Sequence, residues 1–311
     1  MALGYGQVSG VDVFNTFAPV VKSITVRLLL ALAFIFNMHI HQLDVSNAFC
    51  YADIESDVYM QPTTDFELPL GHCFKLLKSL YGLRSSPRSW WKNLDKYIKL
   101  LHFVPCVLEP CMYHMQYKGT PMYLCTHVDD IIIACSELAY ICEIKQKLRD
   151  RYDMTDMGAL EHFLNVRVTR SCRYIQLDQS VYTQKVLDTF SVHLGTETKV
   201  RKCPLPCDTM NRIAKEQKEC SEEDHRYVDN FPYRSMLDAL LYLSMNTRPN
   251  ISYAVGLLSR FRSKPTKVTC MLMVYRLQYI RGTVLMGIRF SGSRFDMQVF
   301  SDADWAGDVL T

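Results

Sequence analysis

Three aspartates are the residues of this chain best suited to do chemistry. Asp44 closes an alternating apolar segment, and Asp129 and Asp130 lie together between two apolar, β-rich runs. Carboxylates beside such runs need compensation, which a metal cation supplies efficiently. One Asp from one strand and two from an adjacent hairpin can hold two Mg²⁺ ions for in-line phosphoryl transfer. The alternative is that turn Asp residues only hydrogen-bond their own backbone.

The elements that position these aspartates are predicted from hydrophobic periodicity. Residues 40–45 alternate with a period of two, which predicts a strand, and residues 122–135 predict a hairpin with the Asp-Asp pair at its turn. Helices are predicted over 20–36 and from Ser86, where a proline fits the first turn because its missing N–H costs nothing. Residues 138–152 predict an amphipathic helix with these basic residues on its solvent side: Lys145, Lys147, Arg149 and Arg151.

The second half of the chain is predicted to be more helical. Strands are expected over 163–168 and 174–177, and a helix over 181–190. The polar segment 195–230, interrupted by Cys-Pro-Leu-Pro, predicts a linker. Beyond it the expected elements are three helices and a hairpin-like segment: 233–245, 251–261, 270–280 and 287–305. The predicted fold class is α+β.

The composition is that of a globular protein of 311 residues with a mild net charge of +3. That charge permits a polyanionic partner without demanding one. No apolar run reaches the roughly 18 residues needed to cross a bilayer, and the N-terminus lacks the order of a signal peptide. We therefore expect no membrane partner and a cytoplasmic or nuclear location.

Twelve cysteines are scattered along the chain. In a chain of this length they are expected to be mostly reduced and buried. A zinc site at Cys203, Cys207, Cys220 and His225 is the alternative. Its spacing does not match the usual close ligand pairs, and the segment is a Pro-rich loop.

Seven segments resemble the reverse transcriptases of copia-type retrotransposons, in the right order and over nearly the whole chain. They are FNTFAPVVKSITVRLLLALA, HQLDVSNAF, DVYMQP, LLKSLYGLRSSPRSWW, HVDDIII, PYRSMLDALLYLSMNTRPNISYAVGLLSRF and FSDADWAGD. The second resembles the family's first catalytic motif and the fifth its Tyr-x-Asp-Asp hairpin. The last resembles the first strand of its ribonuclease H domain. Each match alone is modest evidence, but their common order and spacing are strong evidence.

The resemblance implies a set of catalytic residues. Asp44, Asp129 and Asp130 would bind two Mg²⁺ ions, with Mn²⁺ as an alternative, and the backbone carbonyl of Val45 would complete one metal shell. Phe49 would lie under the incoming sugar as a steric gate, because an aromatic ring there leaves no room for a 2′-hydroxyl. A core phenylalanine is the alternative at that position.

The resemblance also implies a nucleotide and template loop. Tyr81, Gly82 and Arg84 would belong to it, and Gly82 would allow close backbone approach. Arg84 and Arg88 would contact phosphate or remain solvated. His127 stands where the family's hairpin motif usually has Tyr.

The implied architecture is a right-hand polymerase with an antiparallel-sheet palm, partial fingers, a helical thumb and connection region, and the first strand of a ribonuclease H-like domain. Expected domains are partial fingers with palm and thumb over 1–192, a linker over 193–231, connection helices over 232–295 and a ribonuclease H start over 296–311, where Asp302 matches the first carboxylate. The implied partners are an RNA template, a DNA primer, deoxynucleoside triphosphates and the remainder of a polyprotein. An intact element would assemble a virus-like particle.

Four departures from the family pattern keep a second function open. The segment MALGYGQVSGVDV has no Lys or Arg where the family has a basic strand, and His127 replaces Tyr. Asn165 replaces a usual Gly, although Asn tolerates positive φ. The sequence also stops shortly after one ribonuclease H strand. We therefore expect a polymerase truncated at both ends, and the alternative is an inactive remnant that at most binds nucleic acid.

Overall fold

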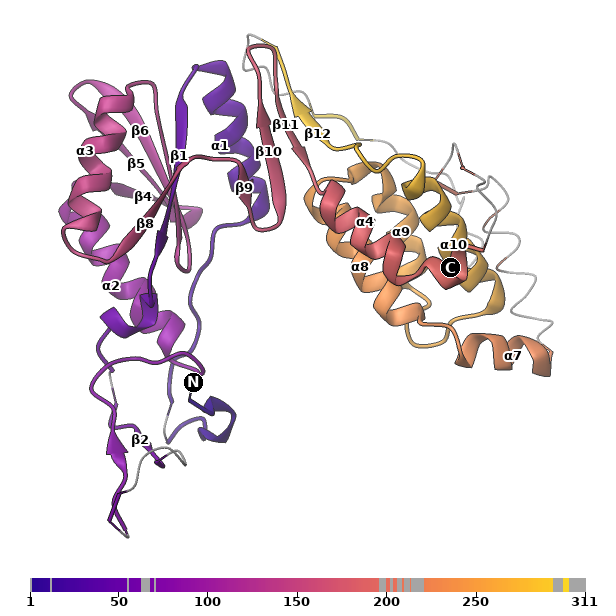
Figure 1. Cartoon of the computed structure of the whole chain (residues 1–311), viewed down its shortest axis with the longest axis horizontal. Coiled ribbons are helices and arrows are strands. Elements are labelled where there is room, and N and C mark those ends of the chain that lie inside the picture. The colour runs from indigo at the N-terminus through magenta and orange to yellow at the C-terminus, as the bar shows by residue number, and fades with distance from the viewer. Residues whose placement is uncertain are drawn as a thin grey trace. The chain divides into compact units, whose positions relative to one another are not determined.

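The computed structural model divides into two compact units, Met1–Leu160 (unit 1) and Glu161–Thr311 (unit 2) (Figure 1). It describes residues 2–11, 13–54, 56–62, 68–69, 71–195, 200–201, 204–205, 209, 213, 221–292 and 299–301. Both units combine helices with an antiparallel sheet, which confirms the α+β class. The proposed domain boundaries at residues 192 and 231 remain predictions.

Unit 1 is built on a six-stranded antiparallel sheet in the order β4-β5-β6-β7-β1-β8. The strands are β1 His39–Val45, β4 Val104–Cys106, β5 Glu109–Tyr117, β6 Thr120–His127, β7 Asp130–Cys135 and β8 Met154–Ala159. The predicted strand and hairpin are both present. Neighbours on each side bury β7 and β1 in the middle of the sheet.

The core of unit 1 follows from the alternation of side chains along these strands. On one face Leu43 and Ile131 share a core with α2 (Ser86–Leu100) and α3 (Leu138–Arg149). The other helix, α1 (Ser23–Ile35), lies on the opposite side of the sheet (Figure 1). The three helices therefore agree with the periodicity of the sequence.

The prediction that Lys145 faces solvent is wrong. Its side chain is only 6% exposed, and its Nζ binds the carboxylate of Asp156 and lies 2.8 Å from His41 Nδ1. Burial and the positive charge of Lys145 lower the pKa of His41. Lys145 thus joins α3 to β1 and β8. The helical period places it on the same buried face as Ile141 and Leu148, so the basic character of the side chain was a misleading signal of exposure.

Short elements complete unit 1. They are η1 Gly4–Gly6, η2 Ala48–Tyr51, β2 Tyr59–Met60 and β3 Phe74–Lys75. The described residues before α1, 2–11 and 13–22, form the N-terminal segment. This segment packs on the loop after β3, since the Ala2 amide donates to the Tyr81 carbonyl at 2.8 Å. Across the described part of both units, no helix has the length and apolar character that a membrane span requires.

Unit 2 begins with a four-stranded antiparallel sheet in the order β12-β11-β10-β9. Its strands are β9 His162–Phe163, β10 Val166–Arg170, β11 Ile175–Asp178 and β12 Ile288–Phe290. The β9–β10 hairpin turns through Leu164 and Asn165, whose φ angles are 49° and 61°. Positive φ at both central residues is typical of a type I′ turn. Asn165 therefore occupies a left-handed position, where Asn is better tolerated than most residues.

The helices of unit 2 pack around a second core. They are α4 Ser180–Thr189, α5 Ser191–Leu194, α7 Glu222–Asp229, α8 Tyr233–Asn246, η3 Pro249–Ile251, α9 Ser252–Ser259 and α10 Lys267–Arg281. The segment 195–230, predicted to be a linker, contains the helix α7, and its role as a linker remains a prediction. That helix begins with a capping box, in which Ser221 and Asp224 satisfy each other's backbone amides. Cys203, Cys207, Cys220 and Asp302 lie outside the described residues.

Arg248 is a buried cation held by neutral groups. It is 1% exposed, and its guanidinium donates to the Thr283 carbonyl at 2.9 Å, to Thr283 Oγ1 at 2.7 Å and to Asn250 Oδ1 at 3.1 Å. Burial lowers the pKa of Arg248. These acceptors satisfy its hydrogen bonds without neutralising its charge, which leaves part of the desolvation cost uncompensated.

Replacing Asn250 with aspartate should therefore raise the free energy of unfolding at pH 7 by about 1 kcal/mol, because a charged acceptor strengthens the bond to Arg248. The Tyr279 hydroxyl, which now accepts from Asn250 Nδ2 at 2.7 Å, can donate to the new carboxylate instead. The new carboxylate would have a depressed pKa, so the gain should be lost as the pH falls below about 4. Urea unfolding at pH 7 and pH 3.5 measures both effects. Asn250→Ala is the control and should be less stable than the parent chain. A destabilised Asn250→Asp variant at pH 7 would contradict this account.

Candidate active site

The three aspartates of the sequence lie together at one end of the unit 1 sheet. In the antiparallel register Asp44 of β1 is directly opposite Asp130, the first residue of β7. Asp129 occupies the turn between β6 and β7, and its carbonyl accepts a hydrogen bond of 2.9 Å from the Val45 amide. Two central strands and one turn thus supply the cluster, and Val45 stands beside it.

Burial and neighbouring negative charge raise the pKa of two carboxylates in this cluster, Asp44 and Asp130. Burial raises the pKa of Asp44, and the charge of Asp129 raises it further. Burial also raises the pKa of Asp130, an effect that a hydrogen bond from Gln42 opposes and the charges of Asp129 and Asp44 increase. A positive charge placed among them would relieve this repulsion.

The donor chemistry fits a hard divalent cation, because carboxylate oxygens are its preferred ligands. Over the residues whose positions are described, however, no three His, Cys, Asp or Glu side chains form a preformed metal cage. The mutual repulsion of the carboxylates and their position on adjacent strands are therefore the observations that favour a cation here.

The turn that carries Asp129 is strained and tightly held. Val128 has φ of 56°, which is an unfavourable conformation for a β-branched residue. Its carbonyl accepts a hydrogen bond of 2.6 Å from Nε1 of Trp90, a residue of α2 that is 1% exposed. Such strain persists only where surrounding contacts enforce it, and it concentrates at functional sites.

Replacing Trp90 with phenylalanine should keep an aromatic ring in the core and remove the bond that holds the turn. We expect a loss of about 1–2 kcal/mol in the free energy of unfolding and faster hydrogen exchange at the Asp129 and Asp130 amides. Tyr97→Phe is the matched control, because it removes a comparable bond of 2.6 Å to the Lys147 carbonyl. Equal exchange rates in the two variants would show that Trp90 does not hold the turn.

Two aromatic rings lie beside the cluster. The ring centroids of Phe49, in η2, and Tyr81 are 4.4 Å apart. Burial raises the pKa of the Tyr81 hydroxyl, and the charge of Asp129 adds to that increase. The structure therefore brings the predicted gate residue and the predicted loop next to the aspartates.

The backbone of the loop that contains Tyr81 requires a glycine at position 82. Gly82 has φ of 100°, a conformation that side chains rarely adopt. The N-terminal segment approaches it so closely that a Cβ on Gly4 would lie 2.0 Å from the Gly82 carbonyl oxygen. Close backbone approach at Gly82 is thus made by the chain's own N-terminal segment.

Arg84 of this loop and Arg88, in the first turn of α2, both bind the N-terminal segment. The Arg84 amide donates to Gln7 Oε1 at 2.9 Å, and its Nη1 donates to the Gln7 carbonyl at 3.1 Å. Arg88 Nη1 donates to the Phe17 carbonyl at 2.9 Å. Neither arginine therefore needs phosphate to acquire a hydrogen-bond acceptor.

His127, at the end of β6, pairs across the strands with Asp130.

Sequence reasoning missed the contacts of Gln42, Trp90 and Val128 around the cluster. Gln42 Nε2 donates to Asp130 Oδ1 at 2.7 Å. A glutamine within a buried strand signals a specific hydrogen-bond partner, and a valine in a tight turn signals strain. Both signals were present in the sequence, but neither names the partner.

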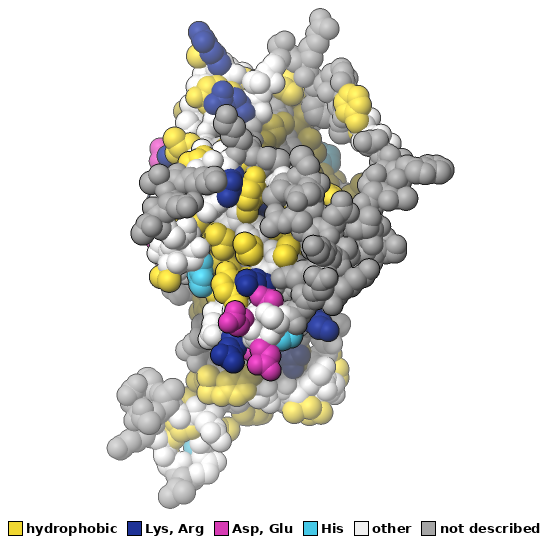
Figure 2. All heavy atoms as spheres, turned by 90° about the vertical axis from the view of Figure 1, so that its right-hand side faces the viewer, with side chains coloured by type: hydrophobic (Ala, Val, Ile, Leu, Met, Phe, Trp, Pro, Cys, Tyr) yellow, Lys and Arg dark blue, Asp and Glu magenta, His cyan; other side chains and the backbone are white. Residues whose placement is uncertain are grey.

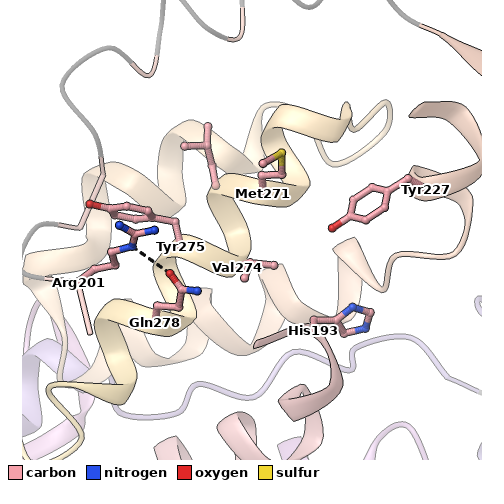
Figure 3. Close-up of a pocket in the computed structure, with 8 residues that line it drawn as sticks. His193, Arg201, Tyr227, Met271, Val274, Tyr275 and Gln278 are labelled. Carbon is pink, nitrogen blue, oxygen red and sulfur yellow. Dashed lines mark hydrogen bonds between the residues drawn. The ribbon is translucent and has the colours of Figure 1, made fainter. Parts of the chain in front are cut away.

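A separate cavity of about 610 Å³ lies in unit 2, and Figure 3 shows its lining. Arg201 stacks over the ring of Tyr275 at 4.5 Å, and its Nε donates to Gln278 Oε1 at 3.0 Å. The described lining residues include no aspartate or glutamate. This cavity therefore does not offer the carboxylate chemistry of unit 1.

The charged side chains of unit 2 are mixed in sign. On the face that Figure 2 shows, Lys and Arg side chains lie near Asp and Glu side chains, with apolar groups between them. Two ion pairs also place opposite charges side by side. Lys267 Nζ lies 2.6 Å from Asp224 Oδ1, and Arg262 Nη1 lies 2.8 Å from Asp238 Oδ1. At these described positions, basic side chains are therefore paired with acidic ones and do not form a patch of a single sign.

Comparison with known proteins gives consistent matches. A family described as "Reverse transcriptase (RNA-dependent DNA polymerase)" matches residues 1–205. The chain is 31% identical over 311 residues to the retrovirus-related Pol polyprotein from transposon TNT 1-94 of Nicotiana tabacum, covering 98% of the chain and 23% of that protein. It is 32% identical over 312 residues to the corresponding polyprotein from transposon RE1 of Arabidopsis thaliana, covering 99% of the chain and 20% of that protein. The chain thus spans less than a quarter of the length of these relatives.

Proposed function

Since the chain belongs to the reverse transcriptase (RNA-dependent DNA polymerase) family of copia-type retrotransposons, we propose that it carries that family's site for nucleotidyl transfer. The reaction joins a deoxynucleotide to the 3′ end of a DNA primer paired with an RNA template. The observation that carries the proposal is the cluster in which Asp44 lies opposite Asp130 and Asp129 occupies the adjoining turn.

Reverse transcriptases use divalent metal ions, and in this chain Asp44, Asp129 and Asp130 would hold them, with the Val45 carbonyl as a further ligand. Two Mg²⁺ ions, or Mn²⁺ in their place, would supply Lewis-acid activation of the primer 3′-hydroxyl and stabilise the leaving pyrophosphate. The chain itself contributes two rigid central strands and a turn whose carbonyl groups accept hydrogen bonds from Trp90 and Val45. That rigidity keeps the carboxylates together despite their repulsion.

The aromatic pair gives the proposed site its substrate preference. Phe49 would lie under the sugar of the incoming nucleotide, with Tyr81, Gly82, Arg84 and His127 around the nucleotide and template. The contact between the Phe49 and Tyr81 rings supports this role, because a ring held on one side by another is a firm steric wall.

The finer architecture follows the same proposal. The six-stranded sheet of unit 1 would be the polymerase palm, and the N-terminal residues would be part of the fingers. The helices of unit 2 would form the thumb and connection region, and residues from 296 onward would begin a ribonuclease H domain with Asp302. The remaining partners would be the rest of a Pol polyprotein, in a virus-like particle of the cytoplasm or nucleus.

A second candidate function is nucleic-acid binding without catalysis. Two observations favour it: residues 1–21 contain no Lys or Arg, and Arg84 and Arg88 are engaged by the N-terminal segment. Phosphoryl transfer needs cationic groups around the triphosphate, and the guanidinium groups of these two arginines already donate to backbone carbonyls of the chain.

Primer extension on an RNA template separates the two functions. The purified chain is supplied with Mg²⁺, deoxynucleotides and a labelled primer, beside an Asp129→Asn variant, and binding of the template–primer is measured by fluorescence anisotropy. Extension that is lost in the variant supports the polymerase. Binding without extension favours the second candidate. If the chain neither binds nor extends the template–primer, both candidate functions are contradicted.

A further inference from the structure

We infer that Gln42 determines which divalent cation the site prefers, by making Asp130 a ligand with one available oxygen. The inference deepens the proposed function and rests on it, because it requires Asp130 to bind a cation. Its basis is the hydrogen bond of 2.7 Å from Gln42 Nε2 to Asp130 Oδ1.

The position of Gln42 in the sheet fixes this contact. Gln42 and Asp44 are two residues apart in β1, so their side chains point to the same face. Asp130 lies opposite Asp44, which places Gln42 diagonally across from it. Gln42 is 9% exposed. Because β1 is hydrogen-bonded to β7 on one side and to β8 on the other, its backbone cannot move away from Asp130 without breaking the sheet.

The contact should persist when a cation binds. A buried amide that loses its acceptor costs about 1–3 kcal/mol, so Gln42 Nε2 favours keeping Oδ1. The carboxylate then offers Oδ2 to a cation. Asp130 is then a monodentate ligand because Gln42 holds its other oxygen.

The number of oxygens available discriminates between cations. Mg²⁺ requires near-ideal octahedral geometry and suits single oxygens, whereas Ca²⁺ takes six to eight oxygens and often binds a carboxylate through both. Because Oδ1 already accepts the Gln42 amide proton, binding of a cation through both oxygens is disfavoured. The expected consequence is discrimination against Ca²⁺ at the Asp130 site.

The test measures cation binding without catalysis. Mn²⁺ bound to the full chain is followed by electron paramagnetic resonance and displaced by Mg²⁺ or by Ca²⁺. Gln42→Leu keeps a side chain of similar size and frees Oδ1. We expect the ratio of Ca²⁺ to Mg²⁺ affinity to rise about tenfold, in the range by which groups contacting metal ligands alter affinity.

Gln146→Leu is the matched control. Gln146 Nε2 also donates to an aspartate, Asp150 Oδ1 at 2.7 Å, but on an exposed helix. The affinity ratio of this variant should equal that of the parent chain. If Gln42→Leu fails to fold, as judged by near-ultraviolet circular dichroism, Gln42→Asn replaces it, because its amide is one methylene shorter and should shift the ratio in the same direction.

Two results would overturn the inference in distinguishable ways. In the first, the parent chain binds Mn²⁺ and Asp130→Asn weakens that binding, but the Gln42 variants change the Ca²⁺ and Mg²⁺ affinities equally or not at all. Gln42 is then not a selectivity residue, and the proposed function stands. If Asp130→Asn leaves Mn²⁺ binding unchanged, the metal role of Asp130 fails, and the inference fails with it.

Discussion

Replacing Asp44 with asparagine should lower primer extension at least about 1000-fold and, at the same time, stabilise the metal-free fold. The loss follows from removing one of the proposed metal ligands. The gain follows because burial and the charge of Asp129 raise the pKa of Asp44, so the ionised group opposes folding at neutral pH. Because Asp44 is partly exposed, we expect an increase below about 1 kcal/mol.

The pH dependence of this gain has a definite sign. A carboxyl whose pKa is raised in the folded state binds protons more tightly there than in the unfolded chain. Its contribution to stability is fully present below its ordinary pKa and is lost as the pH rises through the raised one. The advantage of Asp44→Asn should therefore be seen at pH 7.5 and disappear in acid.

Urea unfolding of both chains in metal-free buffer, at pH 7.5 and pH 3, measures the effect. Asp53→Asn is a control, because Asp53 is exposed and pairs with Lys78 at 2.6 Å, so its removal should not stabilise the chain. If Asp44→Asn is less stable than the parent at both pH values, repulsion among the aspartates is not what this variant relieves.

Replacing Phe49 with alanine should lower the preference for deoxynucleotides over ribonucleotides about 100-fold. The ring would no longer block the space of a 2′-hydroxyl, and Tyr81 would lose the contact that holds it at 4.4 Å. A steric clash that excludes one substituent can provide roughly 3 kcal/mol of discrimination, which corresponds to this factor. Steady-state incorporation of dCTP and CTP opposite guanine measures the ratio, because these two nucleotides differ only at the 2′ position.

Phe49→Tyr is the matched variant, since it keeps the ring and should keep the preference. Phe49 is only partly buried against its core, so the alanine variant should still fold, with a loss of about 1–2 kcal/mol. An unchanged ratio in a folded Phe49→Ala variant would assign the residue to the core, and the gate would have to lie elsewhere.

Local sequence patterns were sufficient to predict the elements that carry the candidate site. Alternation over residues 40–45, the apolar runs around Asp129 and Asp130 and the proline after Ser86 predicted β1, the β6–β7 hairpin and the start of α2. These features could be predicted because each depends on local periodicity and on the backbone preferences of neighbouring residues.

The contacts between side chains of distant segments could not be predicted from local patterns. Gln42 and Asp130 are 88 residues apart, and their bond depends on the register between β1 and β7. Lys145 has the spacing of the buried face of α3, together with Ile141 and Leu148, but only the positions of Asp156 and His41 provide the polar partners of its ammonium group. Periodicity specifies the direction of a side chain relative to its own element, whereas its partners depend on the packing of distant segments, which a local pattern does not contain.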